Sequence, residues 1–145
     1  MFQHLLVPTD GSPLAETSAR KALAFAKEVG ARVTALSVKP RFHPFTLRPE
    51  QVEDTKGDRW DVDLHSRDHL ASVERAAREA GVPFEGLVVT SDHPWEAIVQ
   101  TATSKGCDLV AMVSHGRTGV VSLILGGQTQ RVLAHSPVPV LVFRG

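Results

Sequence analysis

The chain has 145 residues, of which 42% are hydrophobic, and its 16 basic residues balance 16 acidic ones. This length suits one domain, which we expect to span residues 1–145. A formal net charge of zero argues against a nucleic-acid partner, because affinity for phosphates needs a surplus of basic residues.

The chain has a single cysteine, Cys107, so an internal disulfide framework is excluded and a cytoplasmic location is expected. An apolar run follows Cys107, and we therefore interpret this residue as the start of a strand rather than as a redox-active thiol. No basic segment opens the chain, and no apolar run approaches the roughly 20 residues of a membrane span. We expect neither a signal peptide nor a membrane partner.

Short apolar runs predict five strands, over residues 5–7, 33–38, 87–89, 109–113 and 138–143. The runs are continuous rather than alternating, which is typical of a parallel sheet covered on both faces. Helical patterns separate them, starting near residue 12, running from about 60 to 80, starting at 94 and following 127. Three of these helices are followed by glycines suited to a left-handed C-terminal position, Gly30, Gly81 and Gly106. This order predicts an open α/β sheet with helices on both faces.

The segment 40–59 breaks this pattern. It contains Pro40, Pro44, Pro49 and Gly57 among residues of mixed charge. We interpret it as one long loop after the second strand, and loops of this length are often functional.

Two loops have the composition of a ligand site, and ligands of parallel sheets bind beyond the carboxyl ends of the strands. Pro8-Thr9-Asp10 follows the first strand, whereas residues 114–119 follow the fourth and Gly126-Gly127 opens the last helix. Glycines at a helix N-terminus let backbone N–H groups approach an anion, whereas Asp10 suits hydroxyl or amino donors. Turn formation and helix capping explain the same residues equally well. A P-loop and a G-x-G-x-x-G fingerprint are absent.

Several segments together resemble the universal stress protein family. They are residues 4–12, 35–38, 114–119, 125–126, 129–132 and 136–142, and the resemblance covers nearly the whole chain. It implies a five-stranded parallel sheet of order 3-2-1-4-5, with an adenine nucleotide at the switch point between strands one and four. It also implies a cytoplasmic stress-response protein that forms a homodimer.

The nucleotide-binding branch of this family resembles G-x-x-G, nine residues, then G-[ST]. Gly116 and Gly126 match this pattern, with nine residues between them. Val113 stands where the first glycine is expected, and Gly127 stands where serine or threonine is expected. These departures put the phosphate site in doubt, although Thr129 offers a substitute hydroxyl. The alternative is a family member that binds no nucleotide and acts through protein contacts.

The resemblance assigns site residues one by one. Pro8, Thr9 and Asp10 would contact adenine and ribose, and the backbone of Val38 would meet the adenine edge. Met112 and Val113 would line the floor, with the phosphates held by the residues of the second loop and last helix: Gly116, Arg117, Gly126, Gly127, Gln128 and Thr129. The implied ligand is ATP, ADP or AMP, with Mg²⁺ as an optional companion. No residue has the pattern of a general base, so we predict no catalytic residue and at most slow ATP hydrolysis or self-phosphorylation.

A weaker constellation lies in the second predicted helix. Asp61, His65 and His69 follow one another four residues apart and so share one helical face, a pattern that can bind a divalent metal. A solvated polar face explains the same spacing, and we predict no native metal site.

The last apolar run predicts the dimer interface. In the expected strand order, residues 138–143 form an edge strand, and an exposed apolar edge favours pairing with a second copy about a two-fold axis. Pro137 and Pro139 lack N–H donors, so the pairing should centre on residues 140–143.

Overall fold

The fold is known from a computed structural model, which describes residues 1–9, 13–39, 68–114 and 127–144. The strands are β1 (His4–Thr9), β2 (Arg32–Lys39), β3 (Phe84–Thr90), β4 (Leu109–Ser114) and β5 (Val140–Arg144). The helices are α1 (Pro13–Val29), α3 (Pro94–Ser104) and α4 (Gly127–His135), and residues 68–80 are also helical. The predicted loop 40–59 and the start of the second predicted helix lie outside the described residues.

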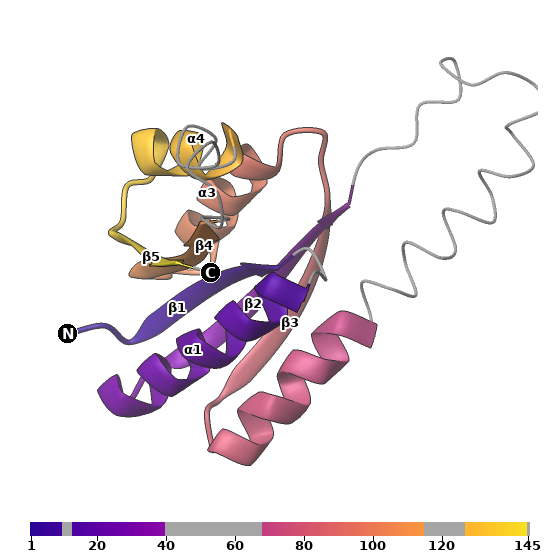
Figure 1. The fold of residues 1–145 in the computed structure, drawn as a ribbon. Coiled ribbons are helices and arrows are strands. Elements are labelled where there is room, and N and C mark those ends of the chain that lie inside the picture. Colours follow the sequence, from indigo (N-terminus) through magenta and orange to yellow (C-terminus); the bar gives the residue numbers. More distant parts are fainter. Residues whose placement is uncertain (10–12, 40–67, 115–126, 145) are drawn as a thin grey trace, which may run out of the picture.

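The five strands form one sheet of order β3-β2-β1-β4-β5, and every neighbouring pair is parallel. Figure 1 shows α1 and the helix of residues 68–80 on one side of this sheet, and α3 and α4 on the other. The predicted α/β fold and strand order are therefore confirmed. The order reverses between β1 and β4, and this reversal defines where a ligand site is expected.

Alternation along the central strands divides the core into two apolar clusters. Leu5 and Val7 of β1 face the cluster under α1 and residues 68–80, whereas Leu6 faces the cluster under α3 and α4. Leu5 and Leu6 are both fully buried. Successive strand residues point to opposite faces, so a strand buried on both faces must be apolar throughout, as the sequence of β1 is.

Glycines end three of the helices and return the chain to the sheet. Gly30, Gly81 and Gly106 have φ values of 72, 75 and 68°. A side chain with a Cβ is strained in this left-handed region, which is why glycine stands at each turn. The predicted helix ends are thus confirmed. No helix within the described ranges has the length and apolar character needed to cross a membrane.

Candidate functional site

The two central strands, β1 and β4, meet where the strand order of the sheet reverses. β1 pairs with β2 along its whole length, from His4↔Arg32 to Thr9↔Ser37. Its described pairing with β4 joins only Leu5↔Leu109 and Leu6↔Val110. This pairing ends before Pro8, which has no N–H to donate to β4. The carboxyl edge at the reversal is the usual ligand position in this class of fold.

The end of β1 supplies the residues predicted for a nucleoside. Pro8 is half-buried and Thr9, the last residue of the strand, is only 6% exposed. Val38, near the end of β2, is half-buried against the apolar cluster under α3 and α4. Asp10, the residue with the most distinctive predicted role, lies outside the described residues.

The residues predicted for the phosphates are described in part. Met112 is buried in the same apolar cluster that Val38 packs against, so the structure brings these two predicted residues to one face of the sheet. Val113 lies in β4 opposite Phe143, and Gly127 is the first residue of α4. Thr129, in the first turn of α4, is 5% exposed. The remaining predicted residues, Gly116, Arg117 and Gly126, lie outside the described residues.

A contact that the sequence did not predict joins the starts of α3 and α4. The backbone N–H of Trp95 donates to Oε1 of Gln128 over 2.9 Å. This bond satisfies one of the free N–H groups at the N-terminus of α3. The Trp95 ring also lies 4.8 Å from the ring of His135. The side-chain oxygen of Gln128, which is an acceptor and therefore no partner for an anion, is engaged by α3.

His69 also differs from its expected environment. The sequence placed it on a solvated or metal-binding face, but it is only 9% exposed, and its Nε2 is hydrogen-bonded to Oγ1 of Thr9. A signal for this burial was present, since His69, Val73 and Ala77 follow one another at helical spacing. Asp61 and His65 lie outside the described residues. Within the described ranges, no three potential ligands are grouped closely enough to hold a metal ion.

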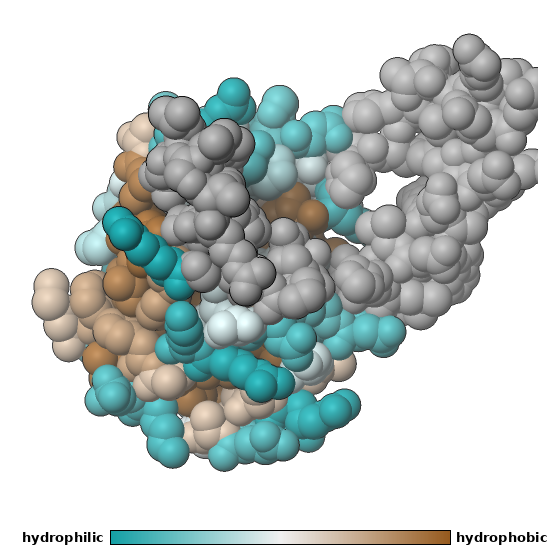
Figure 2. Space-filling model, in the orientation of Figure 1, coloured by the Kyte–Doolittle hydropathy of each residue, from teal (hydrophilic) through white to brown (hydrophobic). Residues whose placement is uncertain are grey.

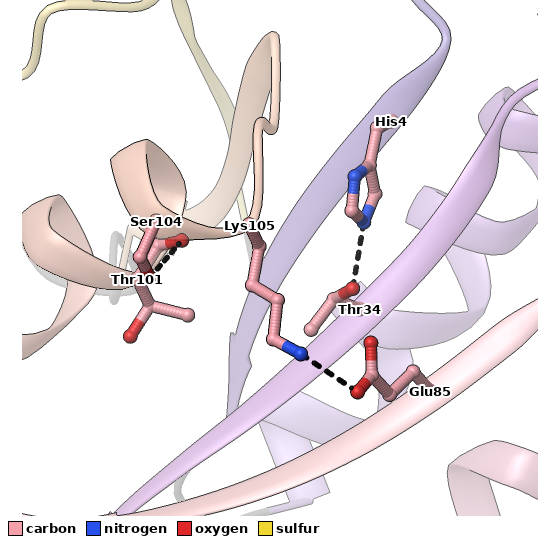
Figure 3. A network of polar contacts seen from close by, with 6 residues as sticks. All are labelled: His4, Thr34, Glu85, Thr101, Ser104 and Lys105. Carbon is pink, nitrogen blue, oxygen red and sulfur yellow. Dashed lines mark hydrogen bonds and ion pairs between the residues drawn. The ribbon is translucent and has the colours of Figure 1, made fainter.

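The opposite, amino edge of the sheet has its own polar network (Figure 3). Nε2 of His4 lies 2.7 Å from Oγ1 of Thr34, and Nζ of Lys105 lies 2.9 Å from Oε1 of Glu85. The Asp108 carboxylate accepts hydrogen bonds from the backbone N–H groups of Gln3 and His4 over 2.8 and 3.0 Å. These contacts fix the start of β1 between β2 and the turn that leads into β4.

Cys107 lies beside this network and is buried. Burial, reinforced by the neighbouring Asp108 carboxylate, raises the pKa of the Cys107 thiol to about 11. The thiolate is the nucleophilic form of cysteine, and so raised a pKa keeps the thiol protonated at neutral pH. This environment agrees with the interpretation of Cys107 as a buried residue that leads into a strand.

His4 predicts a pH dependence of stability. Burial lowers the pKa of His4 below 6.5 and Arg32 lowers it further, whereas Asp108, Glu85 and the Lys105 carbonyl act in the opposite direction. The unfolded chain then takes up the proton more readily than the folded chain. This contribution to stability is complete above pH 6.5 and is lost as the pH falls through the pKa of the folded protein.

Urea unfolding from about pH 7.5 to about pH 5 tests this dependence. We expect His4→Gln to lose less stability than the wild type on acidification, because the glutamine amide cannot be protonated in this range. His93→Gln, at an exposed position, should follow the wild type. Parallel losses for His4→Gln and the wild type would contradict the prediction.

The strand order defines an open α/β sheet with a switch point between β1 and β4, and the comparisons identify its family. The model of the universal stress protein family matches residues 1–144, and this chain belongs to that family. A universal stress protein of Thermus aquaticus is 35% identical over 148 aligned residues, which cover 99% of this chain and 100% of the relative. The solved structure of the Methanocaldococcus jannaschii protein MJ0577 superimposes with a TM-score of 0.80 at 27% identity, over 100% of this chain and 97% of that one.

Two more distant structures share the fold and are described with a ligand. A universal stress protein in complex with cAMP has a TM-score of 0.71 at 21% identity, covering 99% of this chain and 97% of that one. A family member of Arabidopsis thaliana with AMP bound has a TM-score of 0.72 at 17% identity, covering 98% of this chain and 91% of that one. At these identities the likeness establishes the fold.

Proposed function

We propose that this chain binds an adenine nucleotide between the carboxyl ends of β1 and β4, and that it acts in stress response through its bound state rather than through turnover. The observation that carries the proposal is the reversal of the strand order between β1 and β4, the position at which open parallel sheets usually bind ligands. At this switch point Thr9 is the last residue of β1, and Asp10 follows it in the sequence. The adenine nucleotides of the two distant family structures support the choice of ligand class.

The residues that follow β1 and those that follow β4 differ in chemistry, which fits a ligand with a neutral base and charged phosphates. On the β1 side, a carboxylate at Asp10 suits the ribose hydroxyls and would repel phosphates. On the β4 side, Gly127 begins a nine-residue helix, α4, whose first N–H groups are natural partners of an anion. Thr129 follows in the same turn. The backbone N–H of Gln128, the second residue of α4, belongs to this set.

A second candidate function is a family member that binds no nucleotide and signals through protein contacts. Two residues favour it, since Val113 and Gly127 replace the glycine and the hydroxyl residue of the nucleotide-binding pattern. Both functions share the fold, so they differ only in whether a nucleotide occupies the carboxyl edge at the switch point.

Denaturing protein purified from its native cells separates these two functions. We expect adenine nucleotide to appear in the supernatant, detected by its absorbance and by chromatography against ATP, ADP and AMP standards. We expect no more than about one nucleotide per chain, and its retention time identifies the physiological ligand. Nucleotide-free protein that also fails to take up added ATP would favour the function through protein contacts.

We also propose that the chain forms a homodimer through β5. This strand has one neighbour, β4, and its apolar residues 140–143 are half-exposed. Figure 2 shows hydrophobic residues gathered on the side of the molecule where Figure 1 places β5 and the N-terminus. An apolar strand with an open edge is a template for pairing, and two antiparallel copies would satisfy both edges at once.

A further inference from the structure

A buried histidine reaches the end of β1 from the helix of residues 68–80. Nε2 of His69 is hydrogen-bonded to Oγ1 of Thr9, and the two side chains are only 9% and 6% exposed. Thr9 is the last residue of β1, and the next residue in the chain is Asp10. The contact therefore joins a helix to the residue from which the chain leaves the sheet at its carboxyl edge.

The direction of the Thr9 side chain explains how His69 can influence the carboxyl edge of the sheet. Leu5 and Val7 face the cluster under α1 and residues 68–80, and strand alternation places Thr9 on the same face. His69 thus holds Thr9 from within the protein, on the side away from α3 and α4. The hydrogen bond fixes the rotamer of Thr9 and ties the end of β1 to this helix.

The side-chain hydrogen bonds described between this helix and other elements lie near its start. One turn after His69, Oγ of Ser72 donates to Oε1 of Glu16 in α1 over 3.3 Å. The rest of the interface is apolar, formed by residues such as Leu70, Val73 and Ala77. Apolar packing would tolerate a small shift of the helix along the sheet, whereas a buried hydrogen bond has a defined partner and direction.

We propose that the His69–Thr9 hydrogen bond makes His69 a positioning residue of the nucleotide site, which holds the end of β1 at Thr9 in place for the nucleoside. The inference rests on the proposed function and deepens it, because it assigns a residue that the family pattern does not. Its effect should fall on the nucleoside half of the ligand and not on the phosphates, since Thr9 ends β1 whereas the predicted phosphate residues follow β4.

The same chemical pair at the opposite edge provides a matched control. Nε2 of His4 lies 2.7 Å from Oγ1 of Thr34, and these two side chains are 5% and 1% exposed. Both pairs join a buried imidazole to a strand threonine. Only the His69–Thr9 pair lies at the carboxyl edge, so a comparison of the two separates the loss of a buried hydrogen bond from an effect on the site.

A double-mutant cycle with Thr9→Val and His69→Leu tests the proposal, with ATP and inorganic triphosphate as calorimetric ligands. We expect each single variant to weaken ATP about 5- to 10-fold, and the double variant to be no weaker than either single one. His69→Gln, whose amide reaches the position of Nε2, should restore ATP affinity to within about twofold of the wild type. Triphosphate affinity should change less than about twofold in all of them.

The control variants Thr34→Val and Ser72→Ala should lower the urea midpoint and leave ATP affinity within about twofold of the wild type. Urea unfolding of every variant confirms that the titrated protein is folded. If the wild type binds ATP but Thr9→Val and His69→Leu bind it equally well, or weaken triphosphate to the same extent, His69 is not a positioning residue. If the wild type binds no adenine nucleotide, the proposed function fails and the inference fails with it.

Discussion

Replacing Gly126 by valine should weaken the binding of ATP and of inorganic triphosphate together, by about 100-fold or about 2.7 kcal/mol for each. Gly126 directly precedes Gly127, the first residue of α4, in the sequence. A branched side chain there would stand between the ligand and the first N–H groups of the helix. Because these groups serve the phosphates, the nucleoside should make no difference to the loss.

Asp10→Ala is the matched variant for the other half of the ligand. It should weaken ATP about 10-fold and leave triphosphate nearly unchanged, because a carboxylate binds hydroxyl or amino donors and repels phosphates. Isothermal titration of both variants with both ligands gives four affinities to compare with the wild type. If Asp10→Ala lost equal affinity for ATP and for triphosphate, Asp10 would not contact the nucleoside. If Gly126→Val still bound triphosphate, the phosphates would not bind at the N-terminus of α4.

Val142→Pro should convert the dimer into a folded monomer. The N–H of Val110 donates to the carbonyl of Pro139 over 3.0 Å, and Val110 is the Cα partner of Val140. In a parallel ladder this register turns the N–H of Leu141 toward β4 and the N–H of Val142 toward the open edge. Proline at position 142 therefore removes a donor from the proposed interface and spares the ladder inside the subunit.

The other edge of the sheet provides the control for this variant. In β3, the register Val33↔Phe84, with the Val33 N–H donating to Pro83 over 2.9 Å, turns the N–H of Val88 outward in the same way. Val88→Pro should therefore stay dimeric. Sedimentation equilibrium should give two chains of 15.7 kDa for the wild type and Val88→Pro, and one for Val142→Pro. A monomeric wild type, or a Val142→Pro variant that remains dimeric, would exclude β5 as the interface.

The local rules of the sequence were sufficient for the class of fold and its elements, but not for the order of the strands. Continuous apolar runs predicted both-face burial, and Leu5 and Leu6 are indeed buried on opposite faces of β1. The predicted strands lay within or close to the observed ones, with small differences at their ends. The run from 138 predicted a strand that begins at Val140, because Pro139 and the turn before it precede the ladder. Strand order came from the family resemblance, since no local pattern specifies which strands are neighbours.

The sequence predicted where the candidate site lies in the fold, but it did not predict the side-chain contacts around it. Strand ends and helix starts place Thr9, Met112 and Gly127 at one edge from topology alone. The bonds between Thr9 and His69 and between Trp95 and Gln128 join residues 60 and 33 positions apart. Such pairs depend on how helices seat against the sheet, which local periodicity does not encode. Histidine on a helix is also ambiguous by itself, because the same residue suits a solvated face, a metal or a buried hydrogen bond.

Calorimetric titration of the purified, nucleotide-free protein with ATP is the most direct test of nucleotide binding at the switch point between β1 and β4. We predict saturable binding of about one ATP per chain, with a dissociation constant between about 1 μM and about 1 mM, or about −8 to −4 kcal/mol. The melting temperature should rise with ATP concentration, because the ligand binds only the folded state. The absence of both heat and a melting shift at millimolar ATP would contradict the account.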